Sequence, residues 1–471
     1  MNRYYWFFLL MMPLFVESCG KNDDTDDGPS TLGMHLSSDT VYVSKSKLVS
    51  VTVSIDRLDQ LQRLVINKKD NLGISKLYKT ISLPEINGSY LFEYPITEND
   101  APEFDFVFLA YNQGGIMTDA KTLFVQTRPT LYVYNLKMVS KVTGNLHFSE
   151  PSIPSPNNTA ELYDVGCTDL GIAWEMGAGK TGIFFGDTFG KNFVIIPQGG
   201  PGYASNWRSN VLAFSEDTNL ADGLSFSNMA VDKDGNAREI AYSAHNTSGQ
   251  GDFTSIPTAA IRANGVDYLH YMNIRYWGGP RGWETNFSSI YSSSDDGLTW
   301  TSRPEVNFTS GSHFSQVCYA KKDGYVYMIG TLSGRTDAAY LARFNEESLL
   351  EQSSYEYWNK TKGWVKGIES DATAIFEAPV GELSLIYHEK YKRWIVTYLN
   401  QEKYGLVYRH ASDLTGEWSD VQALVLGTAY PSLYGSYIHP VLSQGDRLYF
   451  LMSIWGYYNV YLMKVDMRFC E

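Results

Sequence analysis

Cysteine and positive charge are both scarce in this sequence. The four cysteines among 471 residues are scattered and provide neither a disulfide framework nor the spacing of metal ligands. Lysine and arginine number 38 against 52 aspartates and glutamates, and the formal net charge is −14. Because a nucleic-acid partner needs a basic stripe, this balance argues against one. The histidines show no metal-ligand spacing either, and nothing in the sequence requires a metal or another cofactor.

Long hydrophobic runs are also missing, apart from a short one near the N-terminus. Residues 4–16 are apolar but too few to span a bilayer, and Arg3 precedes them. The run ends at Val16-Glu17-Ser18-Cys19, which resembles a bacterial lipobox with Cys19 as the acylated residue. Residues 20–24 resemble the acidic export signal of Bacteroidetes surface lipoproteins. We therefore expect a signal peptide over residues 1–19, a lipid anchor on Cys19 and a location on the outer membrane, exposed at the cell surface.

Aromatic residues, by contrast, are abundant, with 34 tyrosines, 23 phenylalanines and 11 tryptophans. Aromatic side chains favour strands over helices, and their faces also stack on sugars, although structural tyrosines in sheets are the commoner use. The length suggests two domains. Residues 20–31 are polar and acidic and predict a flexible tether. Residues 32–130 contain roughly seven short alternating segments, which predict an immunoglobulin-like β-sandwich with a spacer or adhesion role.

The segment over residues 139–471 contains a weak internal repeat. Five strand–turn–strand units recur, each followed by a third apolar strand: Asp169–Thr188, Pro257–Ile274, Ser315–Thr331, Glu382–Leu399 and Ile438–Ser453. Five uneven copies of a three- or four-stranded unit predict a five-bladed β-propeller. A β-helix would need shorter and stricter repeats, and a sandwich would not need five copies. The whole chain is therefore expected to be all-β, with the sandwich before the propeller.

Two aspartates, Asp169 and Asp187, flank the first of these units. In an antiparallel pair of strands, the residue numbers of any two directly opposed residues add up to the same total. A turn near Ala178 therefore places Asp169 opposite Asp187 or one residue pair away from it. Neighbouring strands lie ~4.8 Å apart, and paired carboxylates at such range are the machinery of glycoside hydrolysis. The alternative, two strand-end aspartates that cap turns, fits the spacing equally well.

Polar residues recur at the equivalent position of the first strand in all five units: Asp169, Thr258, Gln316, Glu382 and His439. A polar ring around a channel mouth suits a polyhydroxylated ligand, although propeller channels are wet in any case. Glu382 is thus a third catalytic candidate, as an acid or as a group that modulates the pKa values of the pair. Gln316 and His439 are candidate substrate contacts. Arg208 and Asn210 are two more, with a brace between blades as the equal alternative.

Residues 293–300 match the Asp-box pattern S-x-D-x-G-x-T-W in full. This motif marks a turn of a propeller blade, in which Asp295 caps the hairpin and the last residue, a tryptophan, packs below it. Its role is structural, but Asp-boxes also occur in sialidases. Arg262, Arg275 and Arg335 could bind a carboxylate as a triad, whereas scattered arginines are more often solvated or paired. A sialidase-like hydrolase is therefore a minor alternative.

An ordered series of motifs covers the chain from about residue 139 to residue 467. It begins with Thr168-Asp169-Leu170-Gly171 and Phe185-Gly186-Asp187-Thr188-Phe189, continues through Tyr357-Trp358, Gly381-Glu382-Leu383-Ser384 and Gly416-Glu417-Trp418-Ser419, and ends with Tyr434-Gly435-Ser436-Tyr437-Ile438-His439-Pro440 and Ser453-Ile454-Trp455. The series resembles the domain of unknown function 4185, members of which have been placed in glycoside hydrolase family 183, the endo-D-arabinanases.

This resemblance implies a five-bladed propeller that hydrolyses D-arabinofuranosyl linkages in glycans of the arabinogalactan or lipoarabinomannan type, with Asp169 and Asp187 as the two family aspartates. One carboxyl group would be ionised as base or nucleophile and the other protonated as acid, because close carboxylates push their pKa values apart. The sequence does not say which is which. The expected partners are a polysaccharide or oligosaccharide and, on the cell surface, other proteins of glycan utilisation. The rival is a surface glycan-binding propeller without turnover.

Overall fold

The computed structural model describes residues 31–43, 48–69, 74–83, 85–97, 100, 103–127, 130–144, 152–195, 200 and 206–470. The predicted signal peptide, Cys19 and most of the predicted tether lie outside these residues. The described part of the chain consists of strands, a few 3₁₀ turns and one short α-helix, α1 (Thr159–Tyr163), so the all-β prediction is confirmed. No helix in this part has the length and apolar composition to cross a membrane. The chain divides into two compact units, one up to Pro129 and one over Thr130–Cys470.

The first unit contains two sheets that share one apolar core. One sheet has the order β1 (Met34–Leu36), β3 (Leu48–Ile55), β6 (Ser89–Pro95), and the other has the order β2 (Thr40–Tyr42), β8 (Met117–Gln126), β7 (Glu103–Asn112), β4 (Leu61–Lys69), β5 (Ser75–Ser82). Sequence alternation explains the packing, since Phe104, Phe106 and Phe108 on β7 point into the core while the residues between them are partly exposed. Two sheets packed in this way form a β-sandwich.

The second unit contains five sheets within the described residues. The first has β10 (Leu170–Gly177), β11 (Lys180–Phe185), β12 (Val211–Ser215) and β13 (Asn228–Met229), and the second has β14 (Thr254–Ala263), β15 (Val266–Trp277), β16 (Trp283–Ser293) and β17 (Thr301–Thr309). The third has β18 (Gln316–Lys322), β19 (Tyr325–Thr331), β20 (Asp337–Asn345), β21 (Glu356–Asn359) and β22 (Gly363–Lys366), with β23 (Phe376–Val380) paired to β20. The fourth has β24 (Leu383–His388), β25 (Arg393–Asn400), β26 (Gly405–Ala411) and β27 (Gln422–Leu426). The fifth has β28 (Leu433–Ile438), β29 (Arg447–Ile454), β30 (Asn459–Cys470) and β9 (Thr130–Lys141).

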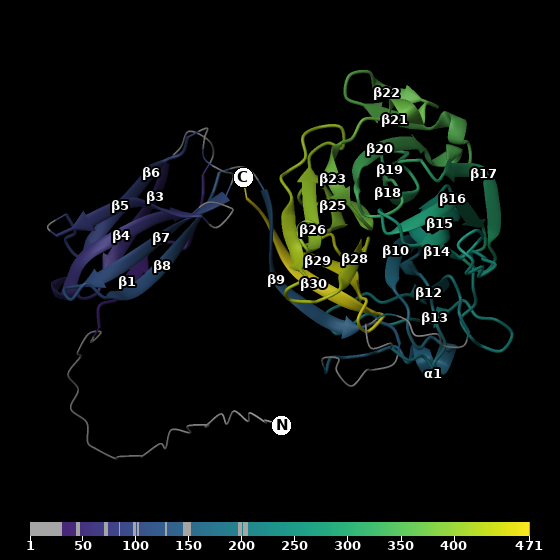
Figure 1. Cartoon of the computed structure of the whole chain (residues 1–471), viewed down its shortest axis with the longest axis horizontal. Coiled ribbons are helices and arrows are strands. Elements are labelled where there is room, and N and C mark those ends of the chain that lie inside the picture. The colour runs from purple at the N-terminus through teal and green to yellow at the C-terminus, as the bar shows by residue number, and fades with distance from the viewer. Residues whose placement is uncertain are drawn as a thin grey trace, which may run out of the picture. The chain divides into compact units, whose positions relative to one another are not determined.

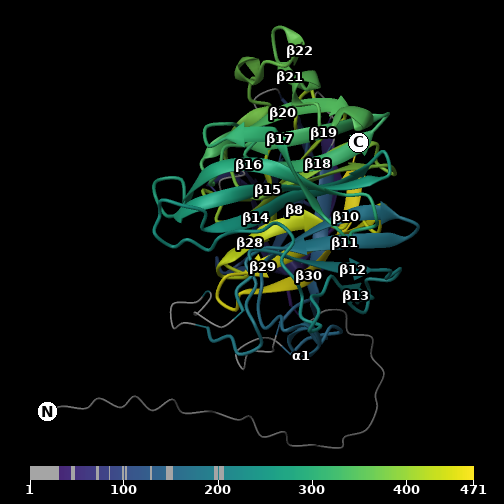
Figure 2. The same cartoon turned by 90° about the vertical axis from the view of Figure 1, so that its right-hand side faces the viewer.

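The first strands of these five sheets form a closed circle. We call β10, β14, β18, β24 and β28 the inner strands; each contacts the next one, and β28 contacts β10. In Figure 1 the sheets lie around a common centre, with β10, β14, β18 and β28 near it. Figure 2 shows β10, β11, β12 and β13 following one another in this order across the first sheet. Strands such as β12 and β26 are buried along their whole length, because apolar sheets must be covered on both faces.

The second unit begins with a strand that completes its last sheet. β9 pairs antiparallel with β30, from Thr130 opposite Cys470 to Lys141 opposite Tyr461. The unit therefore includes residues 130–138, which the predicted boundary at residue 139 leaves out. Hydrogen bonding between two segments at opposite ends of the unit leaves no trace in a local sequence pattern, so a boundary predicted from local patterns misses this strand.

Candidate functional site

Asp169 directly precedes β10, and the first residues of this strand are irregular. Directly after Asp169, Leu170 and Gly171 have φ angles of 69° and 113°, and the ladder shifts register between Leu170 and Ile172. A non-glycine residue at positive φ is strained, and here the backbone N–H of Leu170 is held by Ser453 Oγ at 2.8 Å. Such bulges re-aim the neighbouring side chain and are common next to active sites. The bulge therefore determines where the Asp169 carboxyl group points.

Asp169 and Asp187 lie at the open end of the β10–β11 hairpin. The backbone N–H of Gly186 donates to the carbonyl oxygen of Asp169 at 3.1 Å. One position further out, the hydroxyl groups of Thr168 and Thr188 are 2.7 Å apart. The residue opposite Asp169 is therefore Asp187 or its immediate neighbour, which agrees with the index-sum argument.

The two oxygens of Asp169 differ in their surroundings. The hydroxyl of Tyr434 donates to Oδ2 at 2.9 Å, and a hydrogen bond from the Tyr458 hydroxyl also lowers the pKa of the carboxyl group. Among the described residues, the buried Oδ1 has no close hydrogen-bond partner. Gly186 makes room for Oδ1, because a Cβ atom at that position would lie 2.3 Å from it. A buried oxygen without a partner is destabilising, and each such group in a folded protein calls for an explanation such as a catalytic role.

Asp187 is held by two donors instead. Its Oδ1 accepts hydrogen bonds from Trp207 Nε1 at 2.7 Å and from Thr254 Oγ1 at 2.6 Å, and the residue is buried, with 7% of its surface exposed. Thr254 is the first residue of β14, in the second sheet. The carboxyl group of Asp187 is thus fixed across the junction of two neighbouring sheets.

These unequal surroundings separate the pKa values of the two carboxyl groups. Burial raises the pKa of Asp169 from 3.8 to about 8, and the negative charge of Asp187 acts in the same direction. Burial also raises the pKa of Asp187, to about 6, while the hydrogen bonds from Thr254 and Trp207 oppose the shift. The geometry therefore favours a neutral Asp169 beside an ionised Asp187 near pH 7. This is the division of roles that the sequence left open.

Glu382 lies close enough to influence Asp169 but is itself paired with an arginine. Arg335 donates from Nη2 to Oε1 at 2.5 Å and from Nε to both carboxylate oxygens at 3.1 and 3.2 Å. The guanidinium also lies 5.6 Å from the ring of Tyr434. The charge of Glu382 contributes to the raised pKa of Asp169. The contacts of Glu382 therefore fit a group that holds Arg335 and modulates Asp169.

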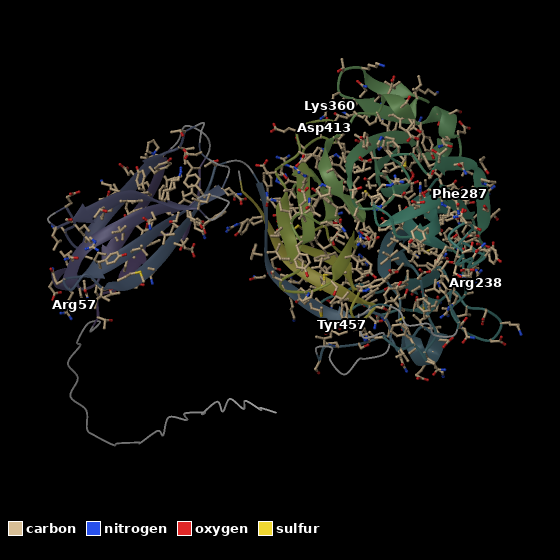
Figure 3. All side chains as sticks on the ribbon, viewed as in Figure 1. Arg57, Arg238, Phe287, Lys360, Asp413 and Tyr457 are labelled. Atoms are coloured by element: carbon tan, nitrogen blue, oxygen red, sulfur yellow. The ribbon has the colours of Figure 1, made fainter. Side chains whose placement is uncertain are left out.

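The loop between β29 and β30 borders the pair on another side. It can be found in Figure 3 by the label of Tyr457. The carbonyl oxygen of Tyr458 accepts the backbone N–H of Thr168 at 3.0 Å. In the same loop Trp455 is 44% exposed, and its ring centroid lies 5.5 Å from that of Tyr458 and 6.5 Å from that of Tyr434. An exposed indole thus stands beside the two tyrosines that surround Asp169.

Arg208 and Asn210 lie near the pair, but their polar groups are engaged with the backbone. Arg208 donates to three carbonyl oxygens, those of Asp164, Asn206 and Ala237, at 2.6–3.2 Å. Asn210 makes four hydrogen bonds: its Nδ2 donates to the carbonyl oxygens of Ala241 and Ser255, and its Oδ1 accepts the backbone N–H groups of Ile240 and Ala241. Both residues are therefore braces, the alternative reading of the sequence, rather than groups free to bind a sugar.

Gln316 and His439, the other two predicted substrate contacts, are placed differently. Gln316 is the first residue of β18; it is 2% exposed, and neither polar atom of its amide has a hydrogen-bond partner. His439 follows the far end of β28, five residues beyond Tyr434, which corresponds to roughly 16 Å along a strand. Burial lowers the pKa of His439 to about 4. Gln316 thus remains a candidate contact, whereas His439 lies at the other end of its strand from Tyr434, the partner of Asp169.

The predicted polar ring was misaligned in two sheets. β14 begins at Thr254 and β28 at Leu433, so Thr254 and Tyr434 take the places that the sequence assigned to Thr258 and His439. β14 is ten residues long, and β28 has a register shift between Tyr434 and Tyr437. Because of these two irregularities, equivalent residues of the repeats are not found at a constant spacing in the sequence. Because a threonine or tyrosine at a strand start carries no signal of its own, only the structure identifies these two partners of the aspartates.

The arginine triad that a sialidase would need is not assembled. Arg262 lies near the far end of β14 and pairs with Asp267 and Asp296 at 2.8 and 2.9 Å. Arg275 pairs with Glu284, and Arg335 pairs with Glu382. Each of the three cations is thus neutralised by its own carboxylate, and Arg262 is at the opposite end of its strand from Thr254. The three arginines do not converge on a common ligand.

A cavity of about 440 Å³ lies between the inner strands. Its lining includes Trp174, Arg262, Lys321 and Tyr387 in the far halves of those strands, and Ile172 and Leu383 near the starts of two of them. Neither aspartate of the pair lines it. Although a well-formed cavity is the usual first choice for a ligand site, the perturbed carboxyl groups are the stronger indication here. Within the described residues no group of three or more histidine, cysteine, aspartate or glutamate side chains is placed to hold a metal ion.

Comparison with known proteins identifies the family. Residues 154–464 match the family described as "Domain of unknown function (DUF4185)", and the chain belongs to this family. The matched region runs from just before α1 into β30 and contains all five inner strands and both aspartates. The resemblance inferred from the ordered motifs is therefore confirmed at the level of the family.

Two fungal proteins are similar over most of their length. One is the notoamide biosynthesis cluster protein J of Aspergillus sp. (strain MF297-2), 28% identical over 336 residues, which are 67% of this chain and 87% of that protein. The other is the notoamide biosynthesis cluster protein J' of Aspergillus versicolor, 28% identical over 64% of this chain and 84% of that protein. Among solved structures, an elastase-activated α2-macroglobulin of Escherichia coli aligns with a TM-score of 0.18 and 8% identity. The alignment covers 93% of this chain, which spans about half of that protein (50%), and it carries no argument about fold or function.

Proposed function

We propose that the second unit is a five-bladed β-propeller that hydrolyses glycosidic bonds at Asp169 and Asp187. The closed circle of inner strands and the sequential order of strands within each sheet support the propeller. In this arrangement β9 completes the fifth blade and joins the start of the unit to its end. The first unit would be an immunoglobulin-like sandwich that acts as a spacer.

The observation that carries the catalytic proposal is the unequal environment of two neighbouring carboxyl groups. Asp169, with its pKa raised to about 8, gives its proton to the oxygen of the leaving sugar as the glycosidic bond breaks. Asp187, with the lower pKa of about 6, supplies the carboxylate that acts at the anomeric carbon. One water is consumed: its hydroxyl group joins that carbon, and its proton restores the carboxyl pair. Tyr434 holds the acid in place, and Arg335 lies 5.6 Å from the Tyr434 ring.

The proposed substrate is a glycan with D-arabinofuranosyl linkages, of the arabinogalactan or lipoarabinomannan type. This choice rests on the resemblance to the endo-D-arabinanases of glycoside hydrolase family 183. The exposed indole of Trp455, beside Tyr434 and Tyr458, supports a sugar ligand because aromatic faces cover the apolar faces of sugar rings. An outer-membrane lipoprotein anchored through Cys19 would meet such a polymer at the cell surface.

The test is to incubate the purified protein with arabinogalactan and to separate the products by chromatography. We expect released arabino-oligosaccharides from the wild type and none from the double variant Asp169→Asn/Asp187→Asn. The matched control is Asp323→Asn, since Asp323 is an exposed aspartate in the β18–β19 turn and asparagine tolerates its positive φ of 54°. Release by the double variant would refute the mechanism. Binding of the glycan without release would support the rival function, a surface glycan-binding protein.

A further inference from the structure

A histidine that the proposed mechanism does not use lies beside Asp187. His245 packs against Trp207 with ring centroids 4.1 Å apart, and Trp207 Nε1 is the donor to Asp187. On its other side, His245 Nε2 lies 3.3 Å from Glu239 Oε1. Its Nδ1 is buried and has no hydrogen-bond partner. The imidazole therefore sits between the carboxylate of Glu239 and the indole that orients Asp187.

The backbone around His245 is constrained to keep it there. Its φ angle is 53°, a conformation that few non-glycine residues adopt. Asp252 holds the loop from inside: it accepts the backbone N–H of Ala244 at 3.0 Å, and its own carbonyl oxygen accepts the N–H of Asn246 at 2.7 Å. Strained residues that the surrounding structure holds in place cluster at functional sites. Asparagine, which tolerates positive φ, is the natural neutral replacement for this histidine.

We infer that His245 is a positioning residue that biases Asp187 toward its ionised form, an inference that rests on the proposed function. A protonated imidazole favours a nearby carboxylate charge, and Glu239 holds the ring beside Trp207 through its contact with Nε2. The other titratable groups around Asp187 are Asp169, Cys167 and Tyr458. Asp169, when ionised, and Glu239 both disfavour a negative charge on Asp187, and the charge of His245 acts in the opposite direction. Through Trp207 the same ring also fixes the orientation of the carboxylate.

The test is the pH dependence of kcat/KM for His245→Asn and His245→Gln. The acidic limb of the pH profile reports the ionisation of Asp187. We expect this limb to move to higher pH by about 0.5–1 unit in both variants, because one nearby positive charge is lost. The alkaline limb, which reports Asp169, should stay in place. A purely structural histidine would lower activity at all pH values without moving either limb, and that result would overturn the inference. So would the failure of both variants to fold, measured by thermal denaturation.

The matched control is another histidine–carboxylate pair in the same unit. His313 Nδ1 lies 2.6 Å from Asp337 Oδ2, and its ring stacks on Tyr340 at 3.8 Å, so His313→Asn removes the same kind of group elsewhere. It should leave both limbs unchanged. If the wild type cleaves no glycan, the proposed function fails, but the inference is still tested by ¹³C NMR of the Asp187 carboxyl group, assigned by its loss in Asp187→Asn. Its titration midpoint must rise in His245→Asn, and an unchanged midpoint overturns the inference.

Discussion

Asp295 and Asp169 are both aspartates at strand ends of the second unit, yet their surroundings are opposite. Asp295 accepts hydrogen bonds from Ser293 Oγ, the backbone N–H of Thr299 and Thr299 Oγ1, at 2.6–2.8 Å. These donors lower its pKa to about 2. Asp169 accepts a hydrogen bond from Tyr434, its buried Oδ1 has no close partner among the described residues, and its pKa is raised to about 8.

The difference separates a carboxyl group that stabilises a turn from one that is kept reactive. In the Asp-box, Asp295 accepts its hydrogen bonds from residues of the same turn, as the sequence predicts, and Trp300 packs 5.3 Å from Phe184 of the first sheet. Asp169 instead disfavours folding in its ionised form, because the cost of burial outweighs the hydrogen bonds that Tyr434 and Tyr458 give to that form. Natural sequences break local rules of this kind mainly at functional sites. The contrast predicts that the two aspartates respond in opposite ways to substitution and to pH.

The largest loss of activity should follow from replacing either Asp169 or Asp187. Substrates with different leaving groups should distinguish the roles of the two residues. Asp169→Asn should lower kcat/KM on arabinogalactan by about 10²–10⁴-fold, but should largely spare a 4-nitrophenyl arabinofuranoside, whose leaving group needs no proton. Asp187→Asn should be inactive on both. Initial rates on the two substrates measure this, with Asp323→Asn as the control. A loss of equal size on both substrates for Asp169→Asn would contradict its role as the acid.

A smaller effect is expected from removing the donor that holds Asp169. Tyr434→Phe should lower kcat/KM about tenfold, since a hydrogen bond to a charged group is worth about 1.5–3 kcal/mol at most. The Tyr434 hydroxyl lowers the pKa of Asp169, so its loss should also move the alkaline limb of the pH profile to higher pH. The full profile of the variant checks both points. An alkaline limb that moves to lower pH would show that Asp169 is not the group reported there.

Local patterns explain why much of the fold could be predicted. The alternation of β7, the turn near Ala178 and the Asp-box depend on residues within about ten positions of one another. The recurrence of such hairpins predicted a series of similar sheets, and the structure has five of them. The first strand of the last sheet was located five residues late, because the bulge after Tyr434 shifts the alternation of β28. The role of β9 was missed because its partner lies at the other end of the unit.

The candidate site could be predicted only in part, because its partners are distant in sequence. The two aspartates share one hairpin, so their proximity follows from antiparallel pairing. Tyr434 lies 265 positions from Asp169, and Thr254 lies 67 positions from Asp187. Burial and these partners set the two pKa values, and neither is visible in a strand pattern. The same limit explains Arg208 and Asn210, whose carbonyl acceptors come mostly from irregular segments and, at Ser255, from a strand of the next sheet.

The stability of the protein should show the raised pKa of Asp169 without any substrate. Because its folded pKa of about 8 lies above the value of 3.8, folding favours the protonated form, and this contribution is lost as the pH rises toward 8. Asp169→Asn cannot ionise, so it should gain stability relative to the wild type with rising pH, by roughly 1–3 kcal/mol at pH 8.5. Denaturant unfolding at pH 5, 7 and 8.5 measures the difference. A constant difference across these pH values would contradict the raised pKa.

The smallest effect at neutral pH, and one of opposite sign, is expected at the Asp-box. The pKa of Asp295 is lowered from 3.8 to about 2, so its ionised form stabilises the fold above pH 3.8, and this contribution is lost as the pH falls toward 2. Asp295→Asn should therefore lower the Tm at pH 7, and the difference from the wild type should shrink at acid pH. Turnover should be unchanged, because the motif contacts only its own hairpin and the neighbouring sheet. Thermal denaturation between pH 2 and 7, with rates at pH 7, tests both statements. A loss of turnover as large as that of Asp169→Asn would remove the distinction between the two aspartates.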